Sequence, residues 1–262
     1  MKSCFSITLL FGISITFWRI SYPISSWAVL SLIPIFLFVF LGTFQNSLDR
    51  RRSIVLSTLR TNSSLLGLLA GKLISALAAL FISTLSLSTV AVHTLLATPI
   101  QIAALLLIVA ASTLAYSCLV GIFKTHVQPL ALSWFSAAAA VFLVSTLFVV
   151  PYSFFEWSVV ERPGYIRLGF DEAMSEALGQ LPRRDDVLNQ AISAFQLVDS
   201  TKLWLASRFQ GTMAPGVLFA AHSALICIVA SMSSVGATSF YRHQIEMRAW
   251  RQPDGAESMK YD

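Results

Sequence analysis

The feature that most constrains this chain is an apolar stretch between Lys72 and Lys124 that contains no Asp, Glu, Lys or Arg. A helix needs about 20 apolar residues to cross the ~30 Å hydrocarbon core of a bilayer, so the stretch is too long for one span. Thr98-Pro99 divides it, because proline restricts the residue before it and does not continue a helix. We therefore predict two antiparallel spans, residues 73–97 and 100–123, joined by a tight turn.

Two later segments have the length and composition of further spans. Residues 130–150 are apolar and are bracketed by Pro129 and Pro151, which are expected to mark the ends of the helix. Another apolar segment, residues 216–240, begins after Pro215. Both segments are close to the length that a bilayer requires.

The N-terminal part of the chain holds two more apolar segments. Residues 27–44 are predicted to span the membrane, with a kink at Pro34. Residues 4–22 are either a retained span or the apolar part of a cleaved signal peptide, and the lack of a clear A-x-A-like cleavage site favours a retained span. The prediction is an all-α, polytopic membrane protein of six transmembrane helices, forming one domain over residues 1–262.

The composition excludes several classes of protein. Only 12% of the residues are charged and 56% are hydrophobic, whereas a soluble domain is about one-quarter charged. This excludes an ordinary soluble enzyme and an intrinsically disordered chain. The sequence has no phosphate-binding loop of the G-x-x-x-x-G-K-[ST] type, no G-x-S-x-G and no H-E-x-x-H, and its three cysteines are scattered singly. We therefore expect no enzymatic activity, metal or cofactor of its own.

The basic residues predict the orientation of the six spans, because Lys and Arg are in excess in cytoplasmic loops. One face carries eleven of them, whereas the short loop on the other face carries only Arg19. The eleven are Lys2, Arg50, Arg51, Arg52, Arg60, Lys72, Lys124, Arg242, Arg248, Arg251 and Lys260. Both termini are therefore predicted to be cytoplasmic, including the tail of residues 241–262. The net charge of +5 then reflects topology and not binding to nucleic acid.

The long segment over residues 152–214 is predicted to form a helical cap on the outer side. Its first helix has an apolar stripe and ends at Pro182; a second starts at Asp185-Asp186. The stripe of the first helix is Phe170, Ala173, Met174, Ala177, Leu178 and Leu181. The predicted apolar face of the second is Val187, Leu188, Ala191, Ile192 and Phe195.

The cytoplasmic loop, residues 45–72, contains a basic and amphipathic stretch. We predict a short helix over residues 48–60, with Asp49 as its N-cap, lying at the inner membrane surface. Two interpretations stay open. The arginines anchor the loop to anionic lipid, at about 1 kcal/mol per charge, or they form a docking surface for a soluble partner.

Two histidines, His93 and His222, are the only ionisable candidates within the predicted spans. An ionisable residue in a span is by default a functional-site hypothesis, and a translocation path is one such function. The alternative is that each histidine hydrogen-bonds between helices as a packing element. An intramembrane enzyme that uses either histidine is a third and weaker hypothesis.

The cytoplasmic loop carries a family resemblance. Its charged start, amphipathic stretch, polar turn near Asn62 and closing Leu68-Leu69-Ala70-Gly71-Lys72 resemble the corresponding loop of ABC-2 type exporter permeases, with L-x-x-G-K at the end. Residues 189–197 of the outer segment are faintly similar to the branch that includes the nitrous-oxide-reductase maturation permease. Arg51-Arg52-Ser53 replaces the acidic-Gly-Thr start that is usual in this family.

The resemblance implies a transmembrane subunit of an ATP-driven exporter in the bacterial plasma membrane. A separate ATPase subunit would bind ATP and Mg, and the chain would form a homodimer or a heterodimer with a second permease. The coupling helix that docks on the ATPase would comprise Asp49, Arg50, Arg51, Arg52, Ile54, Val55, Leu59 and Arg60. The alternative is a structural or accessory subunit of a larger membrane complex that transports nothing itself.

Overall fold

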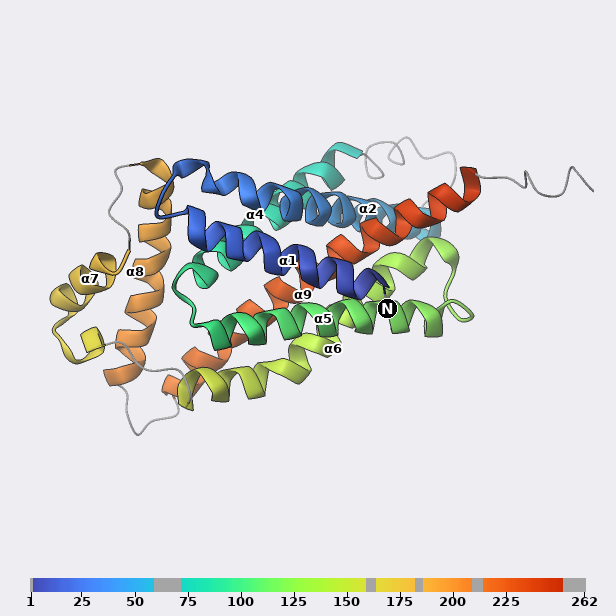
Figure 1. Ribbon diagram of the computed structural model, residues 1–262. Helices are drawn as coiled ribbons and strands as arrows, with labels where there is room; N and C mark the ends of the chain where they lie inside the picture. The colour runs from blue at the N-terminus through green and yellow to red at the C-terminus, as the bar shows by residue number, and fades with distance from the viewer. Residues whose placement is uncertain (1, 59–71, 159–163, 182–185, 209–213, 252–262) are drawn as a thin grey trace, which may run out of the picture.

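The computed structural model describes residues 2–58, 72–158, 164–181, 186–208 and 214–251, and these form a bundle of helices (Figure 1). Six of the described helices are long and apolar enough to cross a membrane. They are α1 (Lys2–Ser21), α2 (Ile33–Thr58), α4 (Lys72–Leu96), α5 (Pro99–Phe123), α6 (Pro129–Ser158) and α9 (Ala214–Arg251). The prediction of an all-helical chain with six candidate spans is confirmed at this level.

The turn between α4 and α5 forms where Thr98-Pro99 predicted it. Thr98 caps α5. Its side chain accepts a hydrogen bond from the backbone N–H of Gln101 at 3.3 Å, and the Gln101 side-chain oxygen accepts one from the backbone N–H of Thr98 at 2.8 Å. This reciprocal pair satisfies two of the amides that a helix start leaves unpaired. Pro99 occupies the first turn, where its missing N–H removes no helical hydrogen bond.

Two prolines act differently from the prediction. Pro34 does not kink the middle of a helix; a 3-10 helix, η1 (Ser26–Leu32), precedes α2, and Pro34 lies in the first turn of α2. That turn is where a helix tolerates proline best. Pro151 does not end the fifth span, because α6 continues through it to Ser158. Pro151 is exposed, so its ring does not disturb the packing of the bundle.

Helix α9 lies at the centre of the bundle and packs against α2, α4, α5 and α6. Small residues at these contacts allow the close approach, because their short side chains leave room for the helix backbones to come together. Ser231, Ser234 and Ala237 of α9 are fully buried, as are Ser75 and Ala79 of α4. These small side chains therefore lie at interfaces between helices.

Helix α1 contributes a full stripe to the core. Ile7, Phe11, Ile15 and Trp18 of α1 recur every three or four residues, Tyr22 follows directly after the helix, and each is at most 2% exposed. The Trp18 indole also donates a hydrogen bond to the Ala91 carbonyl of α4 at 2.9 Å. The first apolar run is thus part of the packed bundle.

The outer surface of the bundle is apolar as well. Large hydrophobic side chains project from it on several helices, among them Phe5 and Phe17 on α1, Phe81 on α4, and Phe142 and Val150 on α6, each at least 60% exposed. Such continuous apolar exposure is destabilising in water and favourable in lipid. The fold therefore supports a multi-pass membrane protein.

Two shorter helices, α7 (Phe170–Gly179) and α8 (Val187–Arg208), lie together at one end of the bundle, while the start of α1 and the end of α9 lie at the other (Figure 1). The predicted stripe of the first helix is buried at Ala173, Met174 and Ala177. Pro182 and Asp185 lie outside the described residues. The side of a membrane that α7 and α8 would face stays a prediction.

The predicted apolar face of α8 is only partly buried. Ile192 is buried, but Ala191 and Phe195 are exposed, and Gln196 and Ser200 are buried instead. The difference arises because α8 packs on one side against α7 and on the other against the bundle. Its contacts therefore do not follow a single apolar stripe.

Candidate functional site

Polar side chains join α5 to the central helix α9. Ser112 donates a hydrogen bond to Ser231 at 2.9 Å, and Thr113 and Ser234 lie 2.7 Å apart. Ser234 also donates to the Val109 carbonyl of α5 at 2.7 Å. All of these side chains are buried, so the bonds form in surroundings that water does not reach. In a membrane, where helices gain little from the hydrophobic effect, such bonds contribute to holding two helices in register.

A second polar junction joins three helices near the far end of α9. The side-chain oxygen Oδ1 of Asn46 on α2 accepts hydrogen bonds from the hydroxyls of Ser133 on α6 at 2.7 Å and of Ser239 on α9 at 3.0 Å. One amide therefore binds two serines on two neighbouring helices. Asn46 also lines the groove described next.

A groove of about 1180 Å³ runs between α2 and α4 on one side and α6 on the other, with α9 as its floor. Its lining from α6 extends from Trp134 to Val149, about 22 Å along the helix at 1.5 Å per residue. Along α9 it extends from Ala224 to Gly236. Small-molecule sites usually measure about 300–1,000 Å³, so this groove has room for a ligand larger than a typical drug.

The two ends of the groove differ in polarity. Most of its length is apolar, with Val141 and Phe142 of α6 and Ile228 and Met232 of α9 along the walls and floor; the hydroxyl residues there are Ser145 and Thr146 of α6. Its polar end is formed by α2, whose Thr43, Asn46, Ser47, Arg50 and Arg51 all line the groove. No Asp or Glu is among the lining residues. The groove is therefore apolar along most of its length and cationic at one end.

The basic residues reach the groove because α2 does not stop at the end of the predicted span. Residues 45–58 continue the same helix, so Asp49 is an interior residue of α2 and not the N-cap of a separate helix. Thr43, Ser47, Arg50 and Ile54 recur at helical spacing, so this continuous helix presents all four on the side that lines the groove. Leu59 and Arg60 lie outside the described residues, as does the side chain of Val55.

The three arginines do not form one cluster on the surface. Successive residues of a helix are turned by about 100°, so Arg50 and Arg51 face the groove, whereas Arg52 is not among its lining residues. The Arg50 guanidinium lies 5.8 Å from the Trp134 ring centroid, within the range of a cation–π contact. Asp49 lies within electrostatic range of Arg52 and of His243 on α9.

The two intramembrane histidines meet beyond the other end of the groove. The His93 ring of α4 and the His222 ring of α9 have their centroids 6.0 Å apart. His93 Nε2 is also 2.9 Å from the Tyr152 hydroxyl of α6. Neither histidine lines the groove, although His222 closely precedes Ala224, the first lining residue of α9. Tyr152 was missed by sequence reasoning because the predicted fifth span ended at residue 150.

The described residues hold few groups that could do chemistry. Among them, no three His, Cys, Asp or Glu side chains come together in a way that could hold a metal ion. Cys4, Cys118 and Cys227 form no disulfide bond among the described residues. The groove is therefore the candidate binding site among the described residues.

Comparison of the chain with models of known protein families, with curated proteins and with solved structures finds no match.

Proposed function

We propose that the chain is the transmembrane subunit of an ABC-2 type exporter in the bacterial plasma membrane. It would work as a dimer with a second permease subunit and with separate ATPase subunits that bind ATP and Mg. The resemblance of residues 49–72 to the loop of this family is the starting point of the proposal. The structural observation that carries it is the continuity of α2, which links the basic segment to the groove.

The continuous helix suggests how a partner's movement reaches the groove. Thr43 lies eleven residues before Ile54 on α2, Ile54 lies near the end of the helix, and both line the same groove. A displacement at the end of α2 therefore changes the shape of the groove, because the helix between these residues is unbroken. An ATPase that binds one position of α2 better would shift the population of the two states.

Arg52 is the described arginine best placed to meet such a partner. It is exposed and lies off the groove, so a soluble subunit can reach it without entering the bundle. Complementary charge across an interface mainly raises the rate and specificity of docking. An acidic rim on the ATPase would complement Arg52.

The test is to co-purify the chain with ATPases encoded in neighbouring reading frames. Arg52→Glu is expected to lower ATPase recruitment and stimulated ATP turnover several-fold, because it places like charges at the interface. Lys124→Glu is the matched control: it makes the same charge change at an exposed position on the same predicted face. Unchanged recruitment by Arg52→Glu would show that the docking assignment is wrong. If no ATPase binds the unaltered chain, the accessory-subunit alternative is favoured.

A further inference from the structure

The groove has the chemical character of a binding site for an amphiphile. Its cationic end and its apolar length are continuous, and both belong to one cavity of about 1180 Å³. A ligand that satisfies both parts needs an anionic head and a long apolar tail. We infer that the groove binds an anionic phospholipid, with its phosphate at Arg50 and Arg51 and an acyl chain along α6 and α9.

The chemistry of the guanidinium groups and the residues around them support the position assigned to the lipid headgroup. Guanidinium groups present several N–H donors in a plane and bind phosphate oxygens in pairs. Arg51 is half-buried and Arg50 rests on the Trp134 ring, which limits the freedom of its guanidinium. Thr43 and Ser47 add hydroxyl groups at the same end. No acidic side chain is among the described lining residues, so their charge favours an anion.

The length of the apolar part of the groove, and the space within it, support the position assigned to the acyl chain. Beyond Trp134, the α6 lining from Ala137 to Val149 covers about 18 Å and is apolar except at Ser145 and Thr146, which exceeds the ~15 Å depth of one leaflet, half of the ~30 Å hydrocarbon core. Ala137, Ala138 and Ala224 leave room between the helices, because none has atoms beyond Cβ. Val141, Ile228 and Met232 then offer apolar surface to a chain that lies in the groove.

Trp134 fits the boundary between head and tail. Tryptophan is enriched at the level of lipid headgroups, where one part of its ring is apolar and the other polar. In this structure it lines the groove beside Arg50 and about two turns before Val141. Its position therefore predicts where the phosphate ends and the acyl chain begins.

This inference requires a membrane but no ATPase, so it can fail or hold independently of the exporter proposal. The experiment uses the full chain, purified in mild detergent and stripped of lipid, and native mass spectrometry to count bound lipids. The probes are phosphatidylglycerol and phosphatidylcholine with identical acyl chains, supplied together in equal amounts. We expect phosphatidylglycerol to be retained in preference. Equal retention of both lipids would overturn the assignment of the head site.

Three arginine variants locate the charge that selects the lipid. The double variant Arg50→Gln and Arg51→Gln is expected to lower phosphatidylglycerol retention about tenfold or more, because two charges near the phosphate are lost. Arg52→Gln removes one charge off the groove and should leave retention unchanged. An equal loss with Arg52→Gln would show non-specific attraction and overturn the site. Arg50→Lys with Arg51→Lys keeps both charges and should retain most of the binding, which separates loss of charge from misfolding.

A second pair of variants tests the groove itself. Ala138→Phe fills the groove from an exposed position on α6 and is expected to lower the retention of both lipids at least several-fold. Ala103→Phe is the control, at an exposed position on α5 outside the groove. Undiminished binding in Ala138→Phe would overturn the inference. So would a shift from dimer to monomer with no change in bound lipid, because the groove would then be covered by a second copy of this chain.

Discussion

Gly42 of α2 lies directly against the backbone of Gly236 of α9, in the middle of the bundle. A Cβ atom added to Gly42 would come within 2.5 Å of the Gly236 carbonyl carbon, closer than real side chains approach. A Cβ on Gly236 would meet Thr43 Oγ1 at 3.1 Å and the Val39 carbonyl oxygen at 3.3 Å, which is tight but less severe. Both glycines are buried, so the two helices touch through their backbones here.

This contact predicts that Gly42→Ala is severely destabilising. The methyl group would meet a backbone carbonyl, which cannot move aside as a side chain can, so α2 and α9 must separate. Overpacking typically costs about 1–3 kcal/mol, and we expect the upper end of that range or more. The measurement is thermal unfolding in detergent, followed by circular dichroism.

Gly121→Ala on α5 is the matched control for that experiment. A Cβ at Gly121 would meet nothing within 4 Å, and alanine is the better helix former by up to about 1 kcal/mol. We expect unchanged or slightly higher stability. Equal losses for Gly42→Ala and Gly121→Ala would mean that the contact does not determine the packing of α2 on α9.

Local chemistry explains which parts of this fold could be predicted from the sequence. The turn at Thr98-Pro99 depends on a cap and a proline a few residues apart, so the sequence contains all of its determinants. The buried face of α7 follows a helical period and was predicted for the same reason. The Gly42–Gly236 contact depends on residues far apart in the chain, and neither glycine has a local signal.

The candidate site was harder to predict than the spans. Arg50, Arg51 and Arg52 form one run in sequence, but their directions depend on whether α2 stops or continues, and the apolar pattern did not settle this. The groove forms from four helices whose relative positions no local pattern specifies. His93 and His222 were both identified from the sequence, whereas their proximity and the contact with Tyr152 required the fold.

The polar contact between α5 and α9 predicts a measurable coupling energy between Thr113 and Ser234. Their hydroxyl oxygens are 2.7 Å apart and buried, and Thr238 lies 3.2 Å from Thr113 in the same network. A double-mutant cycle with Thr113→Val and Ser234→Ala should give a coupling energy of about 0.6 kcal/mol, with an upper limit near 1.7 kcal/mol. Thr16→Val is the control, because Thr16 is exposed and bonds only to the Gly12 carbonyl of its own helix among the bonds observed. A coupling energy of zero would show that α5 and α9 are held together by packing and that the hydrogen bond between Thr113 and Ser234 contributes nothing.

The contact between His93 and Tyr152 predicts a structural effect that is separate from lipid binding. Tyr152→Phe removes the hydroxyl that lies 2.9 Å from His93 Nε2 while keeping the buried ring. We expect a loss of about 1 kcal/mol in stability, the usual net value of one hydrogen bond, and unchanged phosphatidylglycerol retention. Phe154→Leu, at an exposed position of the same helix, is the control. A loss of lipid retention with unchanged stability would instead extend the groove to this cluster.

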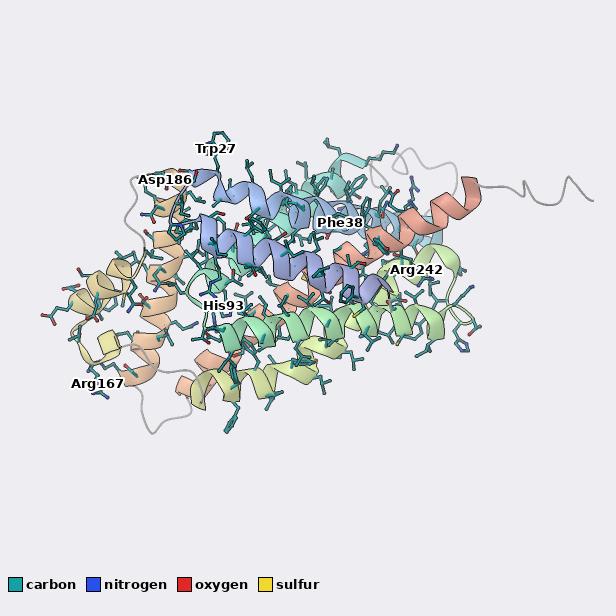
Figure 2. The ribbon with its side chains drawn as sticks, in the orientation of Figure 1. Trp27, Phe38, His93, Arg167, Asp186 and Arg242 are labelled. Atoms are coloured by element: carbon teal, nitrogen blue, oxygen red, sulfur yellow. The ribbon has the colours of Figure 1, made fainter. Side chains whose placement is uncertain are left out.

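The start of α8 is joined to the bundle by two hydrogen bonds at the end where Asp186 and Trp27 lie (Figure 2). The Asp186 side chain accepts a hydrogen bond from the backbone N–H of Asn189 at 2.7 Å, which caps α8, and another from the Ser26 hydroxyl at 2.6 Å. The Tyr22 hydroxyl donates to the Asn189 side chain at 2.8 Å. The single residue Asp186 therefore both starts the helix and holds it to the segment between α1 and α2.

Asp186→Ala is expected to loosen α8 without unfolding the bundle. Loss of an N-cap costs about 1 kcal/mol, and loss of the Ser26 bond adds to it locally. Amide hydrogen exchange should become several-fold faster in the first turns of α8 and stay unchanged in α9, whose packing does not depend on this residue. Gln190→Ala, an exposed change one turn into α8, should leave exchange in both helices near that of the unaltered chain. Faster exchange in α9 as well would show that α8 stabilises the whole bundle and is not a separately attached element.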